Sequence, residues 1–427
     1  MPWQSPISPG VSWYEASVGE RPEYAPLDGS VETDVAIVGG GFTGLQAAYN
    51  LARKGVRVTL IEAHRFGDGA SGRNGGQLGT GQRAEAEEME AEFGFERAKA
   101  LFDMAEDAKR HIHDFASSQN LDIDYVPGQL NVSHKASFEK DFRDHVEIAA
   151  TRYNYPHMTY MDRAETEERV GSKRFFFGLR DTGTGHIHPM KLLVGVARAA
   201  KEAGASLHEK TPALKIERAG GKAVITTARG TIRADKALIA CNAYIGDLEP
   251  KTAAHVMPIR SFIGATVPLD KFPSVIPGGE AIADTRFVVR YFRKTRDGRL
   301  LFGGREAYSE NLDDMTPPIR RQIEEVYPEL KGIELTHAWG GSVGITMPRK
   351  PYVREVLPGI TTIGGYSGHG VMLSNYCGKL YADEVTGGSS QLDLLKALKI
   401  PAFPGGARLR SPLLFLAMTW YAMRDRL

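Results

Sequence analysis

The chain has 427 residues, more than one hydrophobic core usually serves, so we expect two domains. A formal net charge of +1 gives no electrostatic reason for a nucleic-acid partner, and 42% hydrophobic with 25% charged residues is the composition of a soluble globular protein. The two cysteines, Cys241 and Cys377, form no C-x-x-C motif, which argues against a disulfide framework, a zinc site and a redox dithiol.

Residues 1–30 are rich in proline and include Trp3, Trp13 and Tyr14, which predicts an irregular arm lying on the folded body. They lack the basic and apolar regions of a signal peptide. The longest apolar stretch, 413–422, is too short to span a bilayer. We therefore expect a cytoplasmic protein without a membrane span.

A nucleotide-binding pattern follows the arm. The apolar run 35–38 is typical of a strand buried on both faces, and the helical pattern after it ends at Gly55. Between them lie glycines in G-x-G-x-x-G spacing, which permit a tight turn, close approach of a pyrophosphate, and packing of the helix on the sheet. Because the helix start offers free N–H groups to phosphates, we assign this turn to a dinucleotide. The residues concerned are Gly39, Gly41, Phe42, Thr43 and Gly44.

The next strand, 56–61, ends at Glu62, where a carboxylate can accept hydrogen bonds from a ribose diol and repel a 2′-phosphate. This pattern does not separate FAD from NAD. The glycine-rich loop (residues 67–77) comes directly afterwards and is predicted to wrap around a flat phosphorylated ligand, the alternative being a flexible surface loop. The binding residues assigned here are Glu62, Ala63, Ser71, Arg73, Asn74, Gly75, Gly76 and Gln77.

The middle of the chain alternates helices and strands. Residues 84–120 are predicted helical, 121–180 short strands and turns, and 190–203 a helix. Residues 204–242 return to β structure, and the strand 236–242 is predicted to lie beside the nucleotide, with Leu214 and Asn242 in its site. Histidines at 111 and 113 cannot share a helix face, and those at 186 and 188 lack a third ligand, so we expect no metal site.

Residues 256–338 have large side chains and long strands, including 286–293, and predict a second, mostly antiparallel domain with a helix at 318–327. A strand and glycine turn at 360–370 then lead into a helix at 371–384, whose start favours negative charge.

Several motifs together resemble the D-amino-acid oxidase/sarcosine oxidase family of FAD-dependent amine oxidases over nearly the whole chain. They are VAIVGGGFTGL, FGDGASGRNGGQL, GHIHPMKL, GRLLFGG, GGYSGHGV, FPGG and YAMRDRL. The resemblance implies an α/β fold with a Rossmann-like FAD-binding domain, discontinuous over 31–100, 175–255 and 339–390. It also implies a substrate domain over 101–174 and 256–338, beside the arm 1–30 and a tail, 391–427, with a helix.

The resemblance places the late glycine turn at the pyrimidine edge of the flavin. The residues are Gly365, Tyr366, Ser367, Gly368, His369, Gly370 and Val371. Three departures matter. No cysteine occurs at 339–342, which implies noncovalent FAD. Val371 and Met372 replace a carboxylate-binding basic residue, and the strand 300–302 lacks the family's lysine, so the acceptor is oxygen or another oxidant.

The implied activity is FAD-dependent oxidation of a primary amine, gamma-glutamylputrescine or a related polyamine derivative. Hydride transfer to flavin leaves an imine, which water hydrolyses to an aldehyde and ammonia. Reoxidation of the reduced flavin gives hydrogen peroxide if oxygen is the acceptor. His369 and Tyr291 are the candidate catalytic residues. Tyr291, Phe292 and Met372 are candidates for an apolar lining, while Arg290 and Arg305 either bind a distal carboxylate or are sheet-surface charges.

Three alternatives stand beside this one. A secondary-amine or D-amino-acid oxidase or dehydrogenase of the same family is the main one, and a non-catalytic FAD-binding protein is another. A disulfide reductase would need a cysteine pair and a second glycine fingerprint, which the sequence lacks. We expect a monomer or homodimer whose partners are a small-molecule amine and an electron acceptor.

Overall fold

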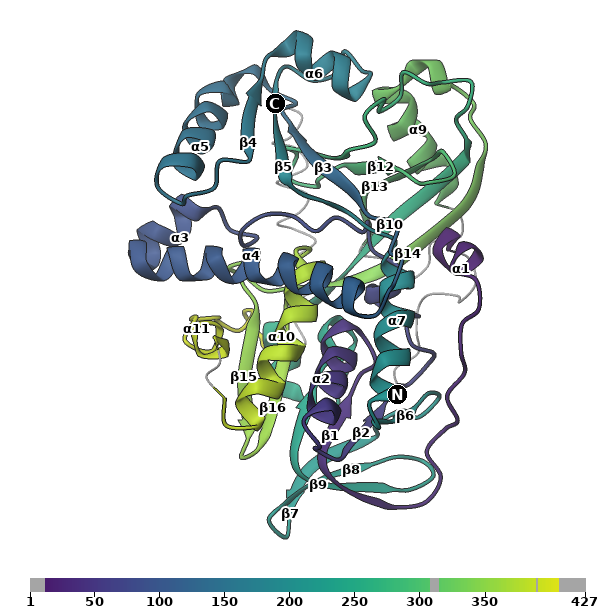
Figure 1. Ribbon diagram of the computed structural model, residues 1–427, viewed down its shortest axis with the longest axis vertical. Helices are drawn as coiled ribbons and strands as arrows, with labels where there is room; N and C mark the ends of the chain where they lie inside the picture. Colours follow the sequence, from purple (N-terminus) through teal and green to yellow (C-terminus); the bar gives the residue numbers. More distant parts are fainter. Residues whose placement is uncertain (1–11, 308–314, 389–390, 407–427) are drawn as a thin grey trace.

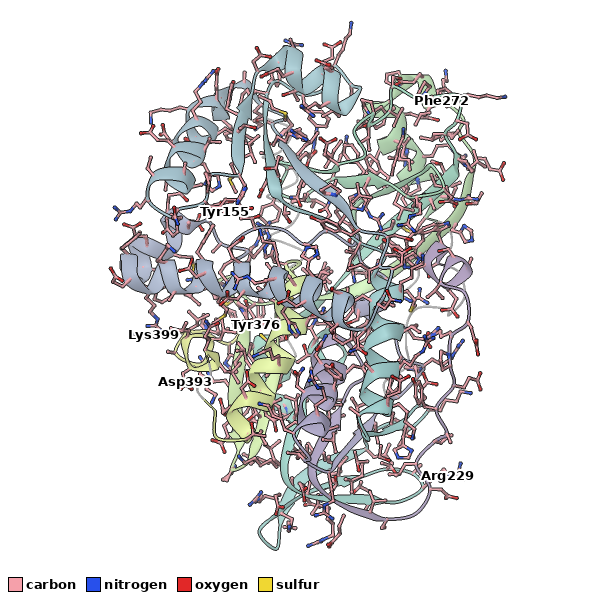
Figure 2. The ribbon with its side chains drawn as sticks, viewed as in Figure 1. Tyr155, Arg229, Phe272, Tyr376, Asp393 and Lys399 are labelled. Atoms are coloured by element: carbon pink, nitrogen blue, oxygen red, sulfur yellow. The ribbon has the colours of Figure 1, made fainter. Side chains whose placement is uncertain are left out.

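The computed structural model describes residues 12–307, 315–388 and 391–406, with side chains omitted at 305–307. Two eight-stranded sheets lie one after the other along the long axis of the molecule, with helix α4 (Phe95–Ser118) between them (Figure 1). Figure 2 shows Tyr155 and Tyr376 on opposite sides of this helix, where Lys109 donates to the Tyr155 hydroxyl and His111 packs against Tyr376. Of the described helices, none is both long enough and apolar enough to cross a membrane.

The first sheet has the strand order β15-β16-β9-β1-β2-β6. Its parallel core consists of β1 (Val31–Val38), β2 (Val58–Ile61), β6 (Ser206–His208), β9 (Thr231–Ile239) and β16 (Ile360–Gly364). The antiparallel strand β15 (Tyr352–Leu357) forms one edge, and the hairpin β7 (Lys215–Ala219) and β8 (Lys222–Thr226) joins through β9. This confirms the Rossmann-like sheet expected from the sequence.

Strand β1 is buried on both faces, as its apolar run predicted. Val35 and Ile37 belong to the larger core with helices α2 (Phe42–Arg53), α7 (Pro189–Glu202) and α10 (Gly370–Val385). Ala36 and Val38 belong to a separate core with the β7–β8 hairpin. Alternate residues of a strand point to opposite faces, so one short run contributes to two cores.

The second sheet has the order β14-β10-β13-β12-β11-β3-β5-β4 and is antiparallel except for the β11–β3 pair. Its strands are β3 (Val126–Val132), β4 (Met158–Met161), β5 (Gly178–His186), β10 (Met257–Pro268), β11 (Ala281–Asp284), β12 (Tyr291–Lys294), β13 (Arg299–Ala307) and β14 (Leu335–Ile345). The mostly antiparallel second domain is therefore confirmed.

The two faces of this sheet have different partners. Phe262, Phe292 and Phe302 form a core with helix α9 (Thr316–Val326). Ile263, Leu301 and Trp339 face the other way and join the core of the first sheet.

The structure corrects the long strand predicted at 286–293, because β12 begins only at Tyr291. The Asp284 carboxylate accepts hydrogen bonds from the N–H groups of Arg286 and Arg290, which holds the preceding segment as a turn.

The helical region predicted at 84–120 is two helices, α3 (Ala86–Phe93) and α4, because Gly94 between them has a φ of +79°. The remaining helices are α1 (Trp13–Ser17), α5 (Glu139–Thr151), α6 (Arg163–Val170), α8 (Pro250–His255) and α11 (Leu392–Lys396). Domain boundaries at 175 and 339 would group β5 and part of β14 with the nucleotide-binding segments, whereas both strands hydrogen-bond within the second sheet. The tail expected to carry a helix includes α11, and its part from 407 on lies outside the described residues.

Candidate active site

The turn between β1 and α2 has the geometry of a phosphate-binding turn. Gly39 has a φ of +112°, and a Cβ there would lie 2.8 Å from the Ala240 carbonyl oxygen. A Cβ on Gly44 would lie 1.9 Å from the Gly39 oxygen, so only glycine lets the helix approach the turn. A Cβ on Gly41 would meet only the Ser71 hydroxyl, at 2.9 Å. The first turn of α2 has no capping side chain from Gly41, which leaves N–H groups for a phosphate.

The glycine-rich loop contacts this helix start. The Phe42 N–H donates to the Ser71 hydroxyl at 3.0 Å. Asn74 stabilises the loop itself, because its amide donates to the carbonyl oxygens of Ala70 and Ser71 and its oxygen accepts from the Gly76 N–H. Its hydrogen-bonding groups thus shape the loop that would surround a ligand.

Two other loop residues tie the loop to its surroundings. Gln77 donates to the Ile282 carbonyl oxygen of β11, at 3.0 Å. The buried Arg73 side chain donates from Nε to the Asp68 carbonyl oxygen, and burial lowers the pKa of its guanidinium. Its own carbonyl oxygen accepts from the Trp339 indole at 3.0 Å.

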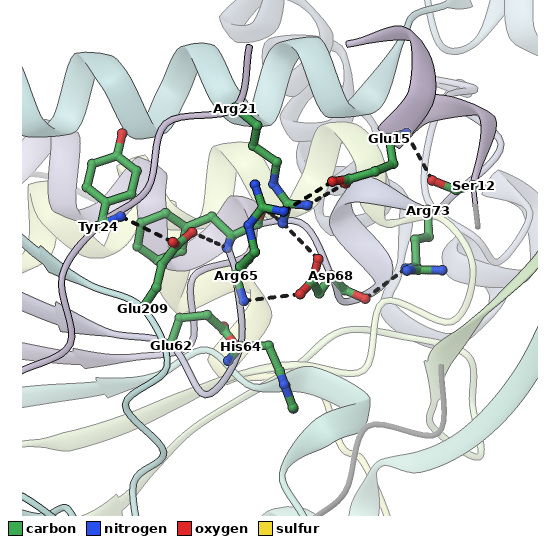
Figure 3. A network of polar contacts seen from close by, with 11 residues as sticks. Ser12, Glu15, Arg21, Tyr24, Glu62, His64, Arg65, Asp68, Arg73 and Glu209 are labelled. Atoms are coloured by element: carbon green, nitrogen blue, oxygen red, sulfur yellow. Dashed lines mark hydrogen bonds and ion pairs between the residues drawn. The ribbon is translucent and has the colours of Figure 1, made fainter. Parts of the chain in front are cut away.

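Glu62 lies at the end of β2 beside the glycine turn, followed by Ala63 (Figure 3). Its carboxylate accepts the N–H of Gly40 at 2.8 Å and that of His64 at 2.9 Å. Burial raises the pKa of Glu62, and the two hydrogen bonds act against this rise. Glu62 therefore lies at the end of the second strand, where the sequence pattern predicts an acid that binds the ribose.

A second helix start meets the first. The Tyr366 and Thr43 hydroxyl oxygens lie 2.7 Å apart, which joins the segment before α10 to the first turn of α2. The Gly365 N–H donates to the Asn242 side chain at 2.8 Å, which holds the end of β16 against the end of β9. Ser367 and Gly368 have φ values of +54° and +89°.

The start of α10 is also uncapped by its own N-cap side chain, and a Cβ on Gly368 would meet no protein atom within 4 Å. A Cβ on Gly370 would crowd Tyr366, and Val371 after it is buried. Two helix N-termini whose own N-cap residues make no side-chain cap thus converge at the carboxyl ends of β1 and β16, the edge at which open α/β sheets bind ligands.

His369 is the N-cap residue of α10 and faces the segment after the glycine-rich loop. Its Nε2 lies 3.0 Å from the Gly81 carbonyl oxygen, and because a carbonyl only accepts, Nε2 carries the proton. A Cβ on Gly79 would lie 2.3 Å from the ring. Burial, with the charge of Arg83, lowers the pKa of His369 to about 4, so the imidazole is neutral at neutral pH.

Tyr291, in strand β12 of the second sheet, packs its ring against the glycine-rich loop. Its ring lies where a Cβ on either Gly75 or Gly303 would be, at 2.9 and 2.3 Å, and its hydroxyl lies 3.1 Å from the Ser261 hydroxyl. The chain from Gly75 to Gly81 therefore contacts the second sheet through Tyr291 and the start of α10 through His369.

Other assigned residues lie elsewhere. Phe292 stacks on Phe302 at 4.9 Å in the outer core, and Arg290 pairs with Glu325 of α9 on that same side, so neither lines the site. Phe292 follows Tyr291 in β12, and neighbouring residues of a strand point to opposite faces. Arg290 lies in the turn before β12, where its side chain pairs with α9.

Met372 is fully buried in the core of the first sheet, and the Leu214 side chain is 54% exposed. Met372 therefore offers no surface to a substrate, and the assignment of Leu214 to the cofactor site stays a prediction. Arg305 lies in β13 opposite Phe262, and its side chain is outside the description.

Sequence reasoning missed Arg293. It lies two residues after Tyr291, and its guanidinium donates to the carbonyl oxygens of Gly75 and Ile187 and to the Tyr14 hydroxyl. The signal available was the spacing of two residues, which puts Arg293 on the face of Tyr291.

Comparison with known proteins identifies the class. Residues 34–384 match the family model described as DAO, FAD dependent oxidoreductase, so the chain belongs to this family of FAD-dependent enzymes. The two helix starts, the glycine turn and Glu62 fit the phosphates and ribose of FAD.

Two relatives match over nearly their whole lengths. The chain is 67% identical over 427 residues, all of both chains, to the probable oxidoreductase OrdL of Rhizobium meliloti (strain 1021). It is 33% identical over 420 residues, 97% of this chain and 98% of the relative, to the gamma-glutamylputrescine oxidoreductase of Escherichia coli (strain K12). Glycine oxidase from Geobacillus kaustophilus shares the fold, with a TM-score of 0.71 and 22% identity over 84% of this chain and 96% of that one.

Proposed function

We propose that this enzyme oxidises a primary amine, gamma-glutamylputrescine or a related polyamine derivative, to an aldehyde and ammonia. The observation that carries the proposal is the similarity to the gamma-glutamylputrescine oxidoreductase, which extends over 97% of this chain. Polyamine breakdown is the corresponding role, and the electron acceptor is oxygen or another oxidant.

FAD, when bound, supplies the group that accepts a hydride from the carbon next to the amine nitrogen. The chain's own contribution is position and environment. Tyr291 contacts the glycine-rich loop at Gly75, so its ring marks the side from which the second sheet meets the cofactor. Its ring, steadied by the contact of its hydroxyl with Ser261, can orient the substrate.

The surroundings favour the neutral amine, the form whose lone pair drives hydride loss. Tyr291 is only partly exposed, and Val371 at the start of α10 is buried and apolar. Removing an ammonium from water lowers its pKa, so such a lining favours loss of its proton before the reaction.

The start of α10 has a separate task. Its free N–H groups and the positive end of its dipole stabilise negative charge placed before them. His369 is neutral and donates to Gly81, which holds the segment after the glycine-rich loop against this helix start. We assign it a hydrogen-bonding role and no proton transfer. FAD is held without a covalent bond in this proposal.

The residues near the helix start favour an amine over an α-amino acid. Val371 and Met372 carry no charge for an α-carboxylate, and Arg290 is paired with Glu325 on the outer face. The distal end of the substrate therefore needs ligands other than Arg290.

Anaerobic mixing tests the proposal. Bleaching of the flavin absorbance should be fastest with gamma-glutamylputrescine and slower with putrescine, sarcosine, D-alanine and glycine. Fastest bleaching by sarcosine or D-alanine would replace the proposal with a secondary-amine or D-amino-acid oxidase. Absence of bleaching by every amine would indicate a non-catalytic flavoprotein. Peroxide measured after admission of air identifies oxygen as the acceptor.

A further inference from the structure

The described part of the N-terminal arm packs against the glycine-rich loop that is assigned to cofactor binding. The family match begins at residue 34, so the arm lies outside the segment that the family model covers. Figure 3 shows the arm beside the glycine-rich loop, with side chains from both segments directed at one another. The contacts include a buried guanidinium, that of Arg21, whose side chain is 5% exposed.

Arg21 has three acceptors. It pairs with Glu15 in the arm, donates to the Phe66 carbonyl oxygen at 2.5 Å, and donates to the Asp68 carboxylate at 2.8 Å. A planar guanidinium can meet several acceptors at fixed angles, whereas a lysine ammonium is a point charge on a flexible stem. Arg21 therefore joins the arm to the loop through both a main-chain and a side-chain contact.

Asp68 transmits this contact to the helix start. Its second carboxylate oxygen accepts the Arg65 N–H at 3.2 Å, and its carbonyl oxygen accepts Nε of Arg73. Three residues later Ser71 accepts the Phe42 N–H in the first turn of α2. The position of Ser71 at the phosphate end of α2 thus depends on a loop whose beginning is held by Arg21.

A second set of contacts joins the arm to the other end of the loop. The Tyr14 ring is fully buried and packs edge-on against Trp339, at 5.4 Å between ring centres. Trp339 donates to the Arg73 carbonyl oxygen, and Arg293 donates to both the Tyr14 hydroxyl and the Gly75 carbonyl oxygen. The loop is therefore held from the arm at Asp68 and again at Gly75.

We propose that the N-terminal arm is part of the FAD-binding apparatus and that Arg21 is a positioning residue for the glycine-rich loop. Arg21 acts through Asp68 and the loop backbone, which place Ser71 beside the first turn of α2. The proposal rests on FAD binding, which the family membership establishes, and is independent of which amine is oxidised.

The test measures FAD affinity without substrate. The holoenzyme is stripped of flavin, and the Kd for FAD is obtained from the quenching of flavin fluorescence on rebinding. Arg21→Met should raise the Kd by about tenfold, equivalent to about 1.4 kcal/mol. Arg21→Lys should fall between this variant and the unchanged protein, because it keeps the charge and loses the fork.

Arg57→Met is the matched control. Arg57 pairs with Asp34 in the same domain, its side chain is 70% exposed, and neither residue touches the glycine-rich loop, so the Kd should not change. Thermal unfolding of each apoprotein separates cofactor binding from general stability, since the increase in Tm caused by FAD should shrink only in the Arg21 variants.

Two results would overturn the proposal. One is an Arg21→Met protein with the Kd of the control. The other is a lower apoprotein Tm with an undiminished increase on adding FAD, which would make the arm a stabilising cover only. Glu15→Gln provides the answer if Arg21→Met does not fold. It removes one charged partner and should raise the Kd by about threefold, as for exchange of a charge-assisted for a neutral hydrogen bond. An unchanged Kd for Glu15→Gln would also count against the proposal.

Discussion

Replacement by alanine of two glycines in the turn between β1 and α2 should weaken FAD binding for different reasons. A Cβ on Gly44 would lie 1.9 Å from the Gly39 oxygen, where ordinary contact starts at 3.4 Å. The helix and the turn must separate by about 1.5 Å, and such overpacking costs about 1–3 kcal/mol. Helix propensity works in the other direction, because alanine is favoured over glycine by about 1 kcal/mol inside a helix. We expect a net loss of stability even without FAD.

Gly41→Ala has a different expected outcome. Its Cβ would lie 2.9 Å from the Ser71 hydroxyl oxygen, and rotation of the Ser71 side chain would relieve this contact at the cost of one hydrogen bond, that from the Phe42 N–H. Replacing glycine by alanine at an N-cap costs about 0.5–1 kcal/mol, so the apoprotein should remain nearly as stable as the unchanged protein. The added methyl group would instead occupy the space through which the pyrophosphate approaches the backbone, and FAD affinity should fall.

The assay is the Tm of each apoprotein together with its Kd for FAD. Gly44→Ala should lower the apoprotein Tm by several degrees and weaken FAD binding, because both the sheet packing and the helix start move. Gly41→Ala should weaken FAD binding by about tenfold or more with little change in the apoprotein Tm. A Gly44→Ala protein of unchanged Tm would refute the packing argument, and full FAD affinity in Gly41→Ala would refute the phosphate site.

Three further predictions concern the second sheet and the buried histidines. Tyr291→Phe should keep its FAD and lose less than about tenfold in kcat/KM, because it loses only a hydroxyl contact with Ser261. Tyr291→Ala should lose far more kcat/KM. Equal losses in the two variants would contradict an orienting role for the ring. Phe292→Ala should lower the unfolding free energy by about 3–5 kcal/mol. The soluble fraction of this variant should keep the KM of the unchanged enzyme, and a raised KM would indicate that Phe292 does line the substrate site. Burial lowers the pKa of His369 to about 4 and those of His186 and His188 to about 3, so the unfolded chain binds more protons below pH 6.5. Stability should therefore be greatest above pH 6.5 and fall between pH 6.5 and 4 by up to about 1.4 kcal/mol per pH unit for each histidine, and a urea midpoint that does not decrease from pH 7 to pH 5 would contradict this.

The nucleotide-binding unit was predictable because its features are local. The turn at Gly39, the start of α2 and the acid at Glu62 belong to one strand–helix–strand unit, and each requirement concerns a residue and its near neighbours in the chain. The late turn before α10 was predictable for the same reason, since positive φ values at Gly365 and Gly368 come with a strand end and a helix start.

The lining of the substrate side was less predictable. An apolar and aromatic strand shows that both faces are buried, and it does not show which face meets the cofactor loop. Tyr291 and Phe292 are adjacent and aromatic, yet one contacts Gly75 and the other stacks on Phe302. Arg290 could be assigned to the outer face only after its contact with Glu325 was seen.

The local order of residues was sufficient to define a β-α-β unit with a glycine turn, a helix start and an acid for ribose, because these depend on short-range backbone geometry. Only the tertiary structure decided which distant segments complete the site. Arg21 lies 47 residues from Asp68, and Arg293 lies 279 residues from Tyr14, and no spacing rule relates such pairs. Their contacts arise because two sheets and the arm pack together, and packing brings residues together by shape and burial whatever their separation along the chain.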